Sequence, residues 1–548
     1  MNAPLVPHFH VSLPALCRHI LIAAVLALTG APTMAADVEP TLPHFDIFEY
    51  DVEGNTRLSD QDIEHAVTPF LGEDKTLRDV DLARAALEKA YHDAGYLTVV
   101  VSIPEQKVDA GAVVLSVLEG RVDRLRIKGA EYHLSSAIKA RMPELAQGGI
   151  PYFPKVQSDL DVLNRSPDLK ATPVLKAGRT PGTVDITLEV DDQLPLHGNL
   201  ELNDRQSPGT RPLRLSGSVR YDNLWQLGHS IGLFAQTAPE AVDQSKVLSA
   251  NYAVPLNTQG NSLVLYAVHA SSNVPGPTSL LSNSDIAGLR LALPLPGTSD
   301  YYHSLSLGLD YKNIHRVEAL VGNSVSTQLQ PAIAYVPLIA TYNGVTSDSG
   351  SSTAADSTLV LGVRGILGNR DEDFAAKRPG SSAQYASLRM GLKHTESFQR
   401  WSASGRIEIQ LATGMLLPNE QYAAGGVDSV RGYLESEQTG DRAYRFSLEV
   451  RTPSVQLGSG NWPLRLTGIG FFDAARLTSL QFDPSRSSAL PSINYTLRGT
   501  GVGLRMSGPK GLSFDIDLAT ALNDGGPGSN NTKAGNYRVH SRLIWEFL

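Results

Sequence analysis

The stretch from Gly425 to Tyr433 contains the side chain of this sequence whose binding chemistry is easiest to predict. Its arginine, Arg431, lies between Val430 and Gly432, so no bulky side chain follows it directly. A guanidinium can hold a carboxylate through two parallel hydrogen bonds. The chemistry to be expected here is ion pairing, with a partner elsewhere in the chain.

No arrangement of residues typical of an enzyme occurs in the sequence. The fourteen histidines show no metal-binding spacing such as His-x-x-x-His beside a carboxylate, and no Gly-x-Ser-x-Gly motif is present. The carboxylate pair Asp191–Asp192 lies near a domain boundary and is most simply explained as solvated. We therefore expect a protein without enzymatic activity, without a bound metal and without a cofactor.

Length and composition limit the class of protein. A chain of 548 residues exceeds one ordinary core, so at least two domains are expected. Only 19% of the residues are charged, yet the body of the chain contains no apolar run long enough for a helical membrane span, which leaves a membrane β-barrel as an allowed architecture. The net charge of −9 gives no reason to expect nucleic acid as a partner.

The first 36 residues have the order of an export signal. Arg18 and His19 precede the apolar run 20–28, and small residues end at Ala35 and Ala36, where cleavage is expected. Residues 37–44 then form a short N-terminal segment. The only cysteine, Cys17, precedes the apolar run, so we expect neither lipid attachment nor disulfide bonds in the cleaved chain.

Two α/β modules are predicted next, over residues 45–120 and 121–192. The first has the order strand, helix, helix, strand, strand, with Ser59 as the cap of its first helix. Its strands are expected at 45–52, 97–103 and 113–118. The second module repeats this order less clearly, with a strand at 121–127 and helices at 137–145 and 156–163.

Residues 193–548 read as strands only. In one of them Tyr444, Phe446, Leu448 and Val450 alternate with polar or charged residues, so the strand has one apolar face and one charged face. The charged face is expected to line a wet lumen. A soluble β-sandwich would not need charged residues on the inward face of strand after strand. Sixteen strands are predicted, at 197–205, 211–222, 229–239, 246–256, 260–271, 283–294, 300–312, 327–340, 355–366, 384–396, 399–412, 441–452, 464–474, 496–507, 511–521 and 537–547.

Several passages resemble two-partner secretion transporters of the hemolysin secretion/activation and filamentous hemagglutinin type, within the outer-membrane protein assembly superfamily. They are the motif 430–433, the stretch 470–475, the passage 163–186, and the turn 51–56 that is similar to the opening of a POTRA domain. The resemblance implies a C-terminal 16-stranded transmembrane β-barrel preceded by two periplasmic α/β POTRA domains. It places the protein in the outer membrane of a Gram-negative bacterium.

The resemblance also assigns a role to the loop that contains Arg431. It implies that Val430, Arg431, Gly432 and Tyr433 fold back into the barrel and that Arg431 pairs with an aspartate on the inner wall. Asp473 is the candidate, because its parity along the strand groups it with Arg465 and Thr467. The chain departs from the family pattern at Ala475, where glycine is usual. It departs again after the last strand, because the family usually ends on an aromatic residue and here Phe547 is followed by Leu548.

Client contact is expected at the first module. In a sheet of strand order 1-3-2 the strand 97–103 is an edge that could add a strand of an unfolded client, although it could equally be an ordinary edge that contacts nothing. The tentative client-binding residues are Leu97, Thr98, Val99, Val100, Val101, Ser102 and Ile103.

Closure of the barrel is expected to depend mainly on the connection from about Leu416 to Gly440, which contains Arg431. Many such transporters begin with a plug helix and a long linker, and residues 37–44 are too few for a spanning helix. The Gly- and Ser-rich stretch 342–355 is the expected substitute.

Two functions are compatible with the sequence. The first is a transporter that moves an unfolded exported client, expected to be a large β-helical exoprotein, from the periplasm to the cell surface. Outer-membrane lipid and the barrel-assembly machinery that inserts the protein are its other expected partners. The second is an assembly factor that inserts other barrels, against which the count of two periplasmic modules argues. A third, an outer-membrane lipase, lacks a recognisable nucleophile.

Overall fold

The computed structural model describes residues 44–108, 110–164, 166–257, 259–274, 279–298, 300–321, 324–458, 462–527 and 531–547. The expected export signal, residues 37–43 and Leu548 lie outside the described residues. Within these ranges, no helix combines the length and the apolar character that crossing a membrane requires.

The first α/β module has the expected order of elements, with an additional short strand, β3 (Gly72–Lys75), between its two helices. Its elements are β1 (Phe45–Ile47), β2 (Glu49–Glu53), α1 (Asp60–Val67), a 3-10 turn (Thr68–Phe70), β3 (Gly72–Lys75), α2 (Leu77–Asp93), β4 (Val99–Ser102) and β5 (Ala112–Glu119). The predicted single strand over 45–52 is divided, because β1 pairs with β3 while β2 joins the sheet β2-β5-β4. The Ser59 side chain accepts a hydrogen bond from the Asp62 N–H, as a helix cap should.

The second module repeats this layout. It contains β6 (Arg121–Lys128), α3 (Ser135–Ala140), a 3-10 turn (Pro143–Leu145), α4 (Phe153–Leu163), β7 (Leu169–Ala177) and β8 (Thr183–Asp192). The sheet order is β6-β8-β7, with β6 parallel and β7 antiparallel to β8. Its core consists of apolar side chains from the helices and the sheet, among them Ile138, Met142, Leu160, Leu163, Leu169 and Leu188.

Asp192, at the end of β8, is not solvated as predicted. Its side chain is fully buried, and Oδ2 accepts hydrogen bonds from the N–H groups of Glu131, Tyr132 and His133, all at 2.8 Å. Oδ1 lies 2.6 Å from His133 Nδ1. Burial alone would raise the pKa of Asp192, but these hydrogen bonds favour the charged form and lower the pKa overall. The carboxylate therefore fixes the chain between β6 and α3.

We expect Asp192→Asn to destabilise a soluble fragment of residues 45–192 by about 2 kcal/mol at neutral pH, because an amide loses the charge and one acceptor oxygen. The contribution of Asp192 is present above the unfolded pKa of about 3.9 and is lost as the pH falls through the lower folded-state pKa. Urea unfolding followed by circular dichroism between neutral and acid pH measures both effects. Asp191→Asn is the control, because Asp191 is exposed; equal losses in the two variants would contradict the assignment.

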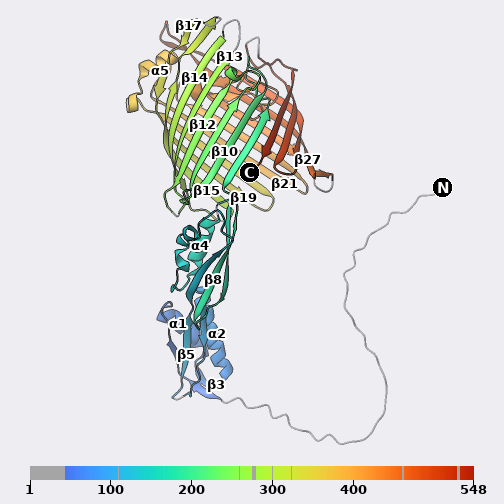
Figure 1. Ribbon diagram of the computed structural model, residues 1–548. Helices are drawn as coiled ribbons and strands as arrows, with labels where there is room; N and C mark the ends of the chain where they lie inside the picture. The colour runs from blue at the N-terminus through green and yellow to red at the C-terminus, as the bar shows by residue number, and fades with distance from the viewer. Residues whose placement is uncertain are drawn as a thin grey trace, which may run out of the picture. The chain divides into compact units, whose positions relative to one another are not determined.

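Residues from 196 onward form a closed antiparallel barrel of sixteen strands, which confirms the predicted fold class (Figure 1). The strands are β9 (Leu196–Asn203), β10 (Arg214–Leu224), β11 (His229–Thr237), β12 (Lys246–Pro255), β13 (Ser262–Val274), β14 (Ser279–Pro294), β15 (Tyr301–Ile314), β19 (Pro337–Ser347), β20 (Ser351–Gly362), β21 (Tyr385–Phe398), β22 (Trp401–Ala412), β25 (Arg442–Arg451), β27 (Leu464–Asp483), β28 (Ser488–Ser507), β29 (Leu512–Ala521) and β30 (Tyr537–Glu546). β30 pairs with β9 and closes the wall.

Shorter elements extend the barrel or belong to its connections. β16 (Val317–Val321), β17 (Ser324–Gln330), β18 (Ile333–Tyr335) and β26 (Val455–Leu457) pair within the barrel sheet. β23 (Tyr422–Ala424) and β24 (Gln438–Gly440) form a separate hairpin, and α5 (Asp371–Lys377) lies in the connection between β20 and β21. Three 3-10 turns cover Val242–Gln244, Ile366–Gly368 and Pro418–Glu420.

The predictions for the eighth and ninth strands were shifted. These strands span 337–347 and 351–362 instead of 327–340 and 355–366, because the alternating residues 317–330 form the β16–β17 hairpin. The stretch 342–355, expected as a substitute plug, therefore belongs to the barrel wall. Its small polar side chains suit a strand with one face toward water. Because Gly and Ser are also common in loops, the sequence-based prediction assigned this stretch to a loop.

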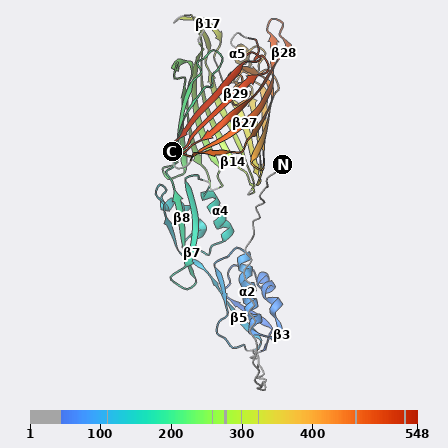
Figure 2. The same cartoon turned by 90° about the vertical axis from the view of Figure 1, so that its right-hand side faces the viewer.

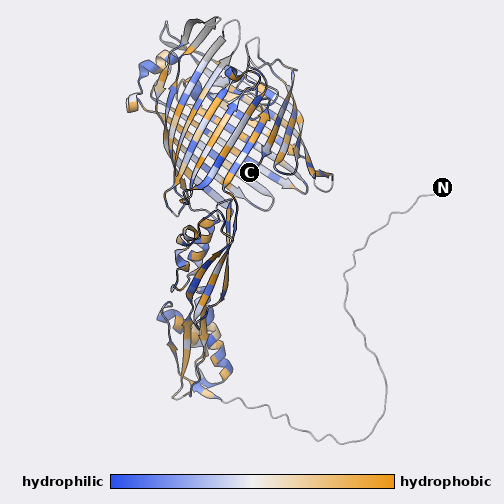
Figure 3. Ribbon diagram, viewed as in Figure 1, coloured by the Kyte–Doolittle hydropathy of each residue, from blue (hydrophilic) through white to orange (hydrophobic). Residues whose placement is uncertain are grey.

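Two faces alternate along the barrel strands. On β25, Tyr444 is 53% exposed, and Phe446 and Leu448 are exposed on the same face. Arg445, Ser447 and Glu449 on the other face line an interior cavity. Figure 3 shows this alternation of polar and apolar residues along the wall strands. The outer face is thus apolar and the lumen polar, as a membrane barrel requires.

The order of strands assigns each connection to one end of the barrel. Only residues 193–195 separate β8 from β9, so β9 starts at the end where the chain enters the barrel. Because neighbouring strands are antiparallel, the connections β22–β25 (residues 413–441) and β29–β30 (residues 522–536) lie at the opposite, far end. β27, β28 and β29 run side by side in the wall (Figure 2).

Candidate functional site

The connection of residues 413–441, here called the arginine loop, carries the four predicted motif residues. The β23–β24 hairpin forms its stem, and its tip spans residues 425–437. Val430 and Tyr433 have no exposed surface, and Arg431 is 5% exposed. A connection that begins and ends at the far end of the barrel is thus buried against other parts of the protein.

Arg431 and Asp473 meet in a bidentate ion pair. Arg431 Nε donates to Asp473 Oδ2 at 2.7 Å, and Nη2 donates to Oδ1 at 3.0 Å. The backbone N–H of Arg431 also donates to Oδ2, at 3.2 Å. Asp473 is 1% exposed and accepts a further hydrogen bond from the Ser447 hydroxyl. Loop and wall are therefore joined by both side chain and backbone.

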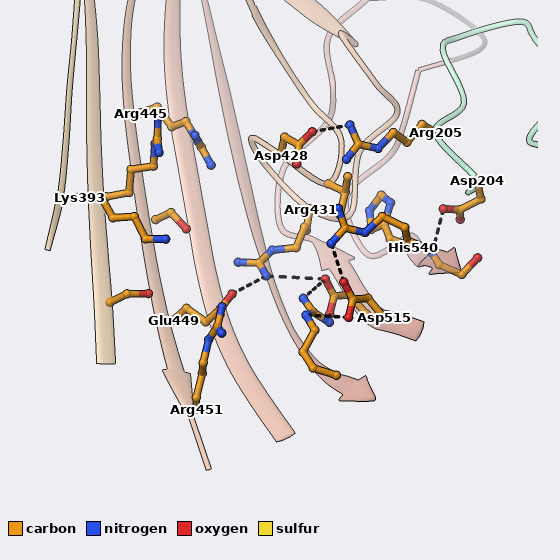
Figure 4. Close-up of a pocket in the computed structure, with 18 residues that line it drawn as sticks. Asp204, Arg205, Lys393, Asp428, Arg431, Arg445, Glu449, Arg451, Asp515 and His540 are labelled. Carbon is orange, nitrogen blue, oxygen red and sulfur yellow. Dashed lines mark hydrogen bonds and ion pairs between the residues drawn. The ribbon is translucent and has the colours of Figure 1, made fainter. Parts of the chain in front are cut away.

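Arg431 faces more negative charge than Asp473 alone supplies (Figure 4). Its Nη1 donates to Glu449 Oε2 at 3.0 Å and lies 3.7 Å from Asp517 Oδ2. The guanidinium stacks over the Phe471 ring, 3.5 Å from its centroid. Burial alone would lower the pKa of Arg431, but the hydrogen bond and charge of Asp473, with the charge of Glu449, raise it overall. The guanidinium therefore stays charged.

Two glycines allow the arginine loop to approach the wall. Gly432 has φ +96°, a conformation that favours glycine, and an added Cβ would lie 3.0 Å from the backbone of Thr520 and Ala521. Gly499, which pairs with Asp473 across β27 and β28, would place a Cβ only 1.9 Å from the Arg431 carbonyl oxygen. Gly499 thus supplies the close approach, while Ala475 is buried in the apolar cluster around Val430 and Tyr433.

Contacts on both sides of Arg431 hold the same loop. The Tyr433 hydroxyl lies 3.0 Å from the Arg498 carbonyl oxygen and 2.8 Å from that of Asn523. The Gly432 N–H donates to His540 Nε2 at 3.0 Å. The buried Glu437 accepts hydrogen bonds from the N–H and the hydroxyl of Thr532 in the β29–β30 connection.

A cavity of about 410 Å³ adjoins Arg431 inside the barrel (Figure 4). Arg205 and Asp428 form an ion pair of 2.5 Å at its border, which joins the arginine loop to the segment after β9. The remaining charged lining residues are Asp204, Lys393, Arg406, Arg445, Glu449, Arg451, Arg505, Asp515, Asp517 and Arg542. The lining carries both positive and negative charges. It therefore suits transient contact with a polar chain rather than tight binding of an apolar ligand.

Several residues of this site were not predicted from the sequence. Glu449 lies on the polar face of a predicted strand, and Phe471 precedes Asp473 in the quoted motif, so each had a local signal. Asp517, Gly499 and His540 had none, because each reaches the loop only through the register of the closed barrel. Glu437 lies in the loop itself, but its partner Thr532 belongs to another connection.

The predicted edge strand is an edge, but a shorter one. β4 spans Val99–Ser102, and Leu97 and Ile103 lie outside it, 52% and 37% exposed. The predicted strand 97–103 is therefore shorter at both ends. The Val101 N–H donates to Glu88 Oε2 at 3.0 Å, and the Val99 carbonyl oxygen lies 3.1 Å from His92 Nε2. Two backbone groups that an added strand would need are thus already occupied.

A sixteen-stranded barrel with an apolar outer face, preceded by two α/β modules of this layout, defines an outer-membrane β-barrel protein of the POTRA-containing class. The family model for the ShlB-type POTRA domain matches residues 45–120. The model for the haemolysin secretion/activation protein ShlB/FhaC/HecB matches residues 182–506. The chain belongs to this family: it is a two-partner secretion transporter of the outer membrane, and its N-terminal POTRA domain lies in the periplasm. The family is one of protein transporters, not of enzymes.

Relatives agree with this assignment. The outer membrane transporter CdiB of Dickeya dadantii is 23% identical over 82% of this chain and 79% of its own length. CdiB of Escherichia coli is 23% identical over 91% of this chain and 83% of its own length.

Solved structures show the same fold. CdiB from Escherichia coli superimposes with a TM-score of 0.63 at 18% identity, covering 94% of this chain and 93% of that one. BamA from Haemophilus ducreyi lacking POTRA domains 1–3 gives a TM-score of 0.53 at 16% identity, covering 92% of this chain and all of that one.

Proposed function

We propose that this transporter binds an unfolded exported client in the periplasm and passes it through the barrel, with the arginine loop as the gate. The observation that carries the gate is the burial of Arg431 against Asp473, Glu449 and Asp517 inside the barrel. The loop begins and ends at the far end of the barrel, so it can leave the lumen without breaking any wall pairing.

The gate opens when this ion-pair network is exchanged for contacts with the client or with water. Breaking a buried pair by removing one partner costs about 3–5 kcal/mol, whereas releasing both partners into a wet lumen costs less, because water then solvates each charge. The polar lining gives an extended chain many weak partners and no deep apolar pocket. No nucleotide or cofactor is needed if folding of the client outside the cell drives its movement.

The proposed client is a large β-helical exoprotein, and the barrel-assembly machinery inserts the transporter itself. Deleting the transporter should strand this one client in the periplasm and leave other barrel proteins at normal levels. Quantitative proteomics of outer-membrane and secreted fractions measures both. A general loss of barrel proteins would instead identify an assembly factor. The similarity to BamA is one of fold and is not evidence for that function.

Client binding in the periplasm is proposed to involve β4 and its flanks, from Leu97 to Ile103. Val100 is 53% exposed and points away from the buried Val99 and Val101. Contact through this side chain requires no change in the structure. Addition of a client strand would also require Glu88 and His92 to release Val101 and Val99.

We expect Val100→Glu to weaken binding of an unfolded client segment about tenfold, because burying a valine contributes about 1.5 kcal/mol or more. Leu82→Glu is the matched control, since Leu82 is 46% exposed on α2 of the same module. Fluorescence anisotropy with a labelled client segment and the full-length protein in detergent measures the affinities. Equal effects of both substitutions would exclude β4 as a specific contact.

A further inference from the structure

Three potential metal ligands from three different elements converge where β8 runs into the barrel. They are Asp168 in the segment before β7, His197 in β9 and Asp222 in β10, and one ligand atom from each lies within 4.8 Å of the other two. The chain itself brings them together. Gln193 N–H donates to the Asp168 carbonyl oxygen at 2.8 Å, and Arg220, two residues before Asp222, pairs with His197 across β9 and β10.

Two buried atoms of this group, one from His197 and one from Asp168, lack hydrogen-bond partners among the described residues. His197 Nε2 lies 2.9 Å from Asp168 Oδ1 and 3.6 Å from Asp222 Oδ2. Nevertheless, within the described part of the chain, neither His197 Nε2 nor Asp168 Oδ2 forms a hydrogen bond of acceptable geometry, although both atoms are shielded from solvent. The Asp168 side chain is only 4% exposed. Buried polar atoms are normally satisfied, so two unsatisfied buried atoms within one group of potential ligands favour a bound cation.

We propose that Asp168, His197 and Asp222 bind a divalent transition-metal ion, with Zn²⁺ as the best fit. Zn²⁺ bonds to nitrogen and oxygen at about 2.0–2.2 Å, which separates ligands of a tetrahedral site by roughly 3.4 Å. The separations of 2.9 and 3.6 Å lie on either side of this value. One imidazole with two carboxylates suits Zn²⁺ better than Ca²⁺ or Mg²⁺, which prefer oxygen ligands only. Asp168 Oδ2 or a water completes the coordination.

The charges around the group agree with a cation. Two carboxylates and a neutral imidazole carry a charge of −2. Among the described residues, Arg220 adds a positive charge, and its Nε donates to Asp222 Oδ2 at 2.9 Å. The rival arrangement is a metal-free ion-pair cluster in which His197 is protonated. The bound ion would link the segment before β7 to the first two barrel strands, a role independent of the proposed gate.

The test uses full-length protein without a polyhistidine tag, purified in detergent and stripped with a chelator. Titration with Zn²⁺ by calorimetry is expected to show one site. His197→Ala and Asp168→Asn should each weaken it at least about 100-fold, since loss of an outer-shell partner already costs about 10–100-fold. His269→Ala is the control, because His269 contacts Asp285 at 2.6 Å elsewhere on the barrel. Heat-modifiable migration in gels verifies that each variant is folded.

Co²⁺ provides a second measurement that reports on geometry. A four-coordinate site should give a visible absorption band that His197→Ala abolishes and excess Zn²⁺ displaces. Absence of this band together with absence of Zn²⁺ binding would overturn the proposal in favour of the ion-pair cluster. Binding that persists unchanged in both His197→Ala and Asp168→Asn would place the metal elsewhere and overturn it equally.

Discussion

Arg431→Ala is expected to lower client secretion at least about tenfold while the barrel remains inserted at its normal level. Removal of the guanidinium leaves Asp473, which is 1% exposed, without its counter-charge, and it also removes the cation that Asp473 shares with Glu449 and Asp517. An uncompensated buried charge costs about 3–5 kcal/mol, which is enough to release the loop from this position. Secreted client is measured by immunoblot, and inserted barrel by heat-modifiable migration in gels.

Two further variants separate charge from geometry. Arg431→Lys keeps a positive charge but loses the bidentate hydrogen bonds and the stacking on Phe471, so an intermediate secretion level is expected. Arg451→Ala is the matched control: Arg451 lines the same cavity and bonds to the same Glu449, but it is 49% exposed. Exposed pairs contribute about 0–1 kcal/mol, so this control should secrete normally. Normal secretion by Arg431→Ala would refute the role of the pair.

Exchanging the two charges should restore little secretion. In Arg431→Asp combined with Asp473→Arg, the new aspartate would face Glu449 and Asp517, which contact Arg431 at 3.0 and 3.7 Å in the native protein. Two like charges would then remain beside it. A substantial rescue would mean that the Arg431–Asp473 pair acts without these neighbours.

Local patterns predicted the fold well where one strand carries its own signal. The alternation of Tyr444, Phe446 and Leu448 with Arg445, Ser447 and Glu449 distinguishes a lipid face from a lumen face within β25 alone. The prediction was shifted at β19 and β20, where small polar residues such as those of 342–355 read equally as strand or loop. Periodicity without large apolar residues leaves strand boundaries undetermined.

The sites depended on information that is not local. Gly499 faces the Arg431 carbonyl oxygen because the register of β27 and β28 places it opposite Asp473. Asp192 appeared solvated because its partners at 131–133 lie 59 to 61 residues earlier in the sequence. His197 shows no metal spacing in the sequence, since Asp168 and Asp222 belong to other elements. Residues that come together only through strand register and tertiary folding have no characteristic spacing in the sequence, so a sequence motif does not reveal them.

Shortening the arginine loop should open the pore. Deletion of Val427–Ser436 removes Arg431 and Tyr433 but leaves Gly425, Gly426 and Glu437 to join Ala424 to Gln438, which are already paired in the β23–β24 hairpin. Gly425 and Gly426 have φ of +110° and +102°, so a short turn is accessible to them. The deletion therefore spares the stem and the wall.

We expect this deletion to raise single-channel conductance in planar bilayers severalfold and to sensitise cells to a large hydrophilic antibiotic such as vancomycin. The physical reason is that a large β-barrel of this strand number encloses an aqueous channel unless protein fills it. Replacing Val427–Ser436 with ten glycine and serine residues is the matched control for length. Because it removes the anchors but keeps the chain, it should give a fluctuating conductance between those of the wild type and the deletion. If a correctly inserted deletion variant conducts no more than the wild type, another part of the protein closes the lumen and the gate proposed for this loop is wrong.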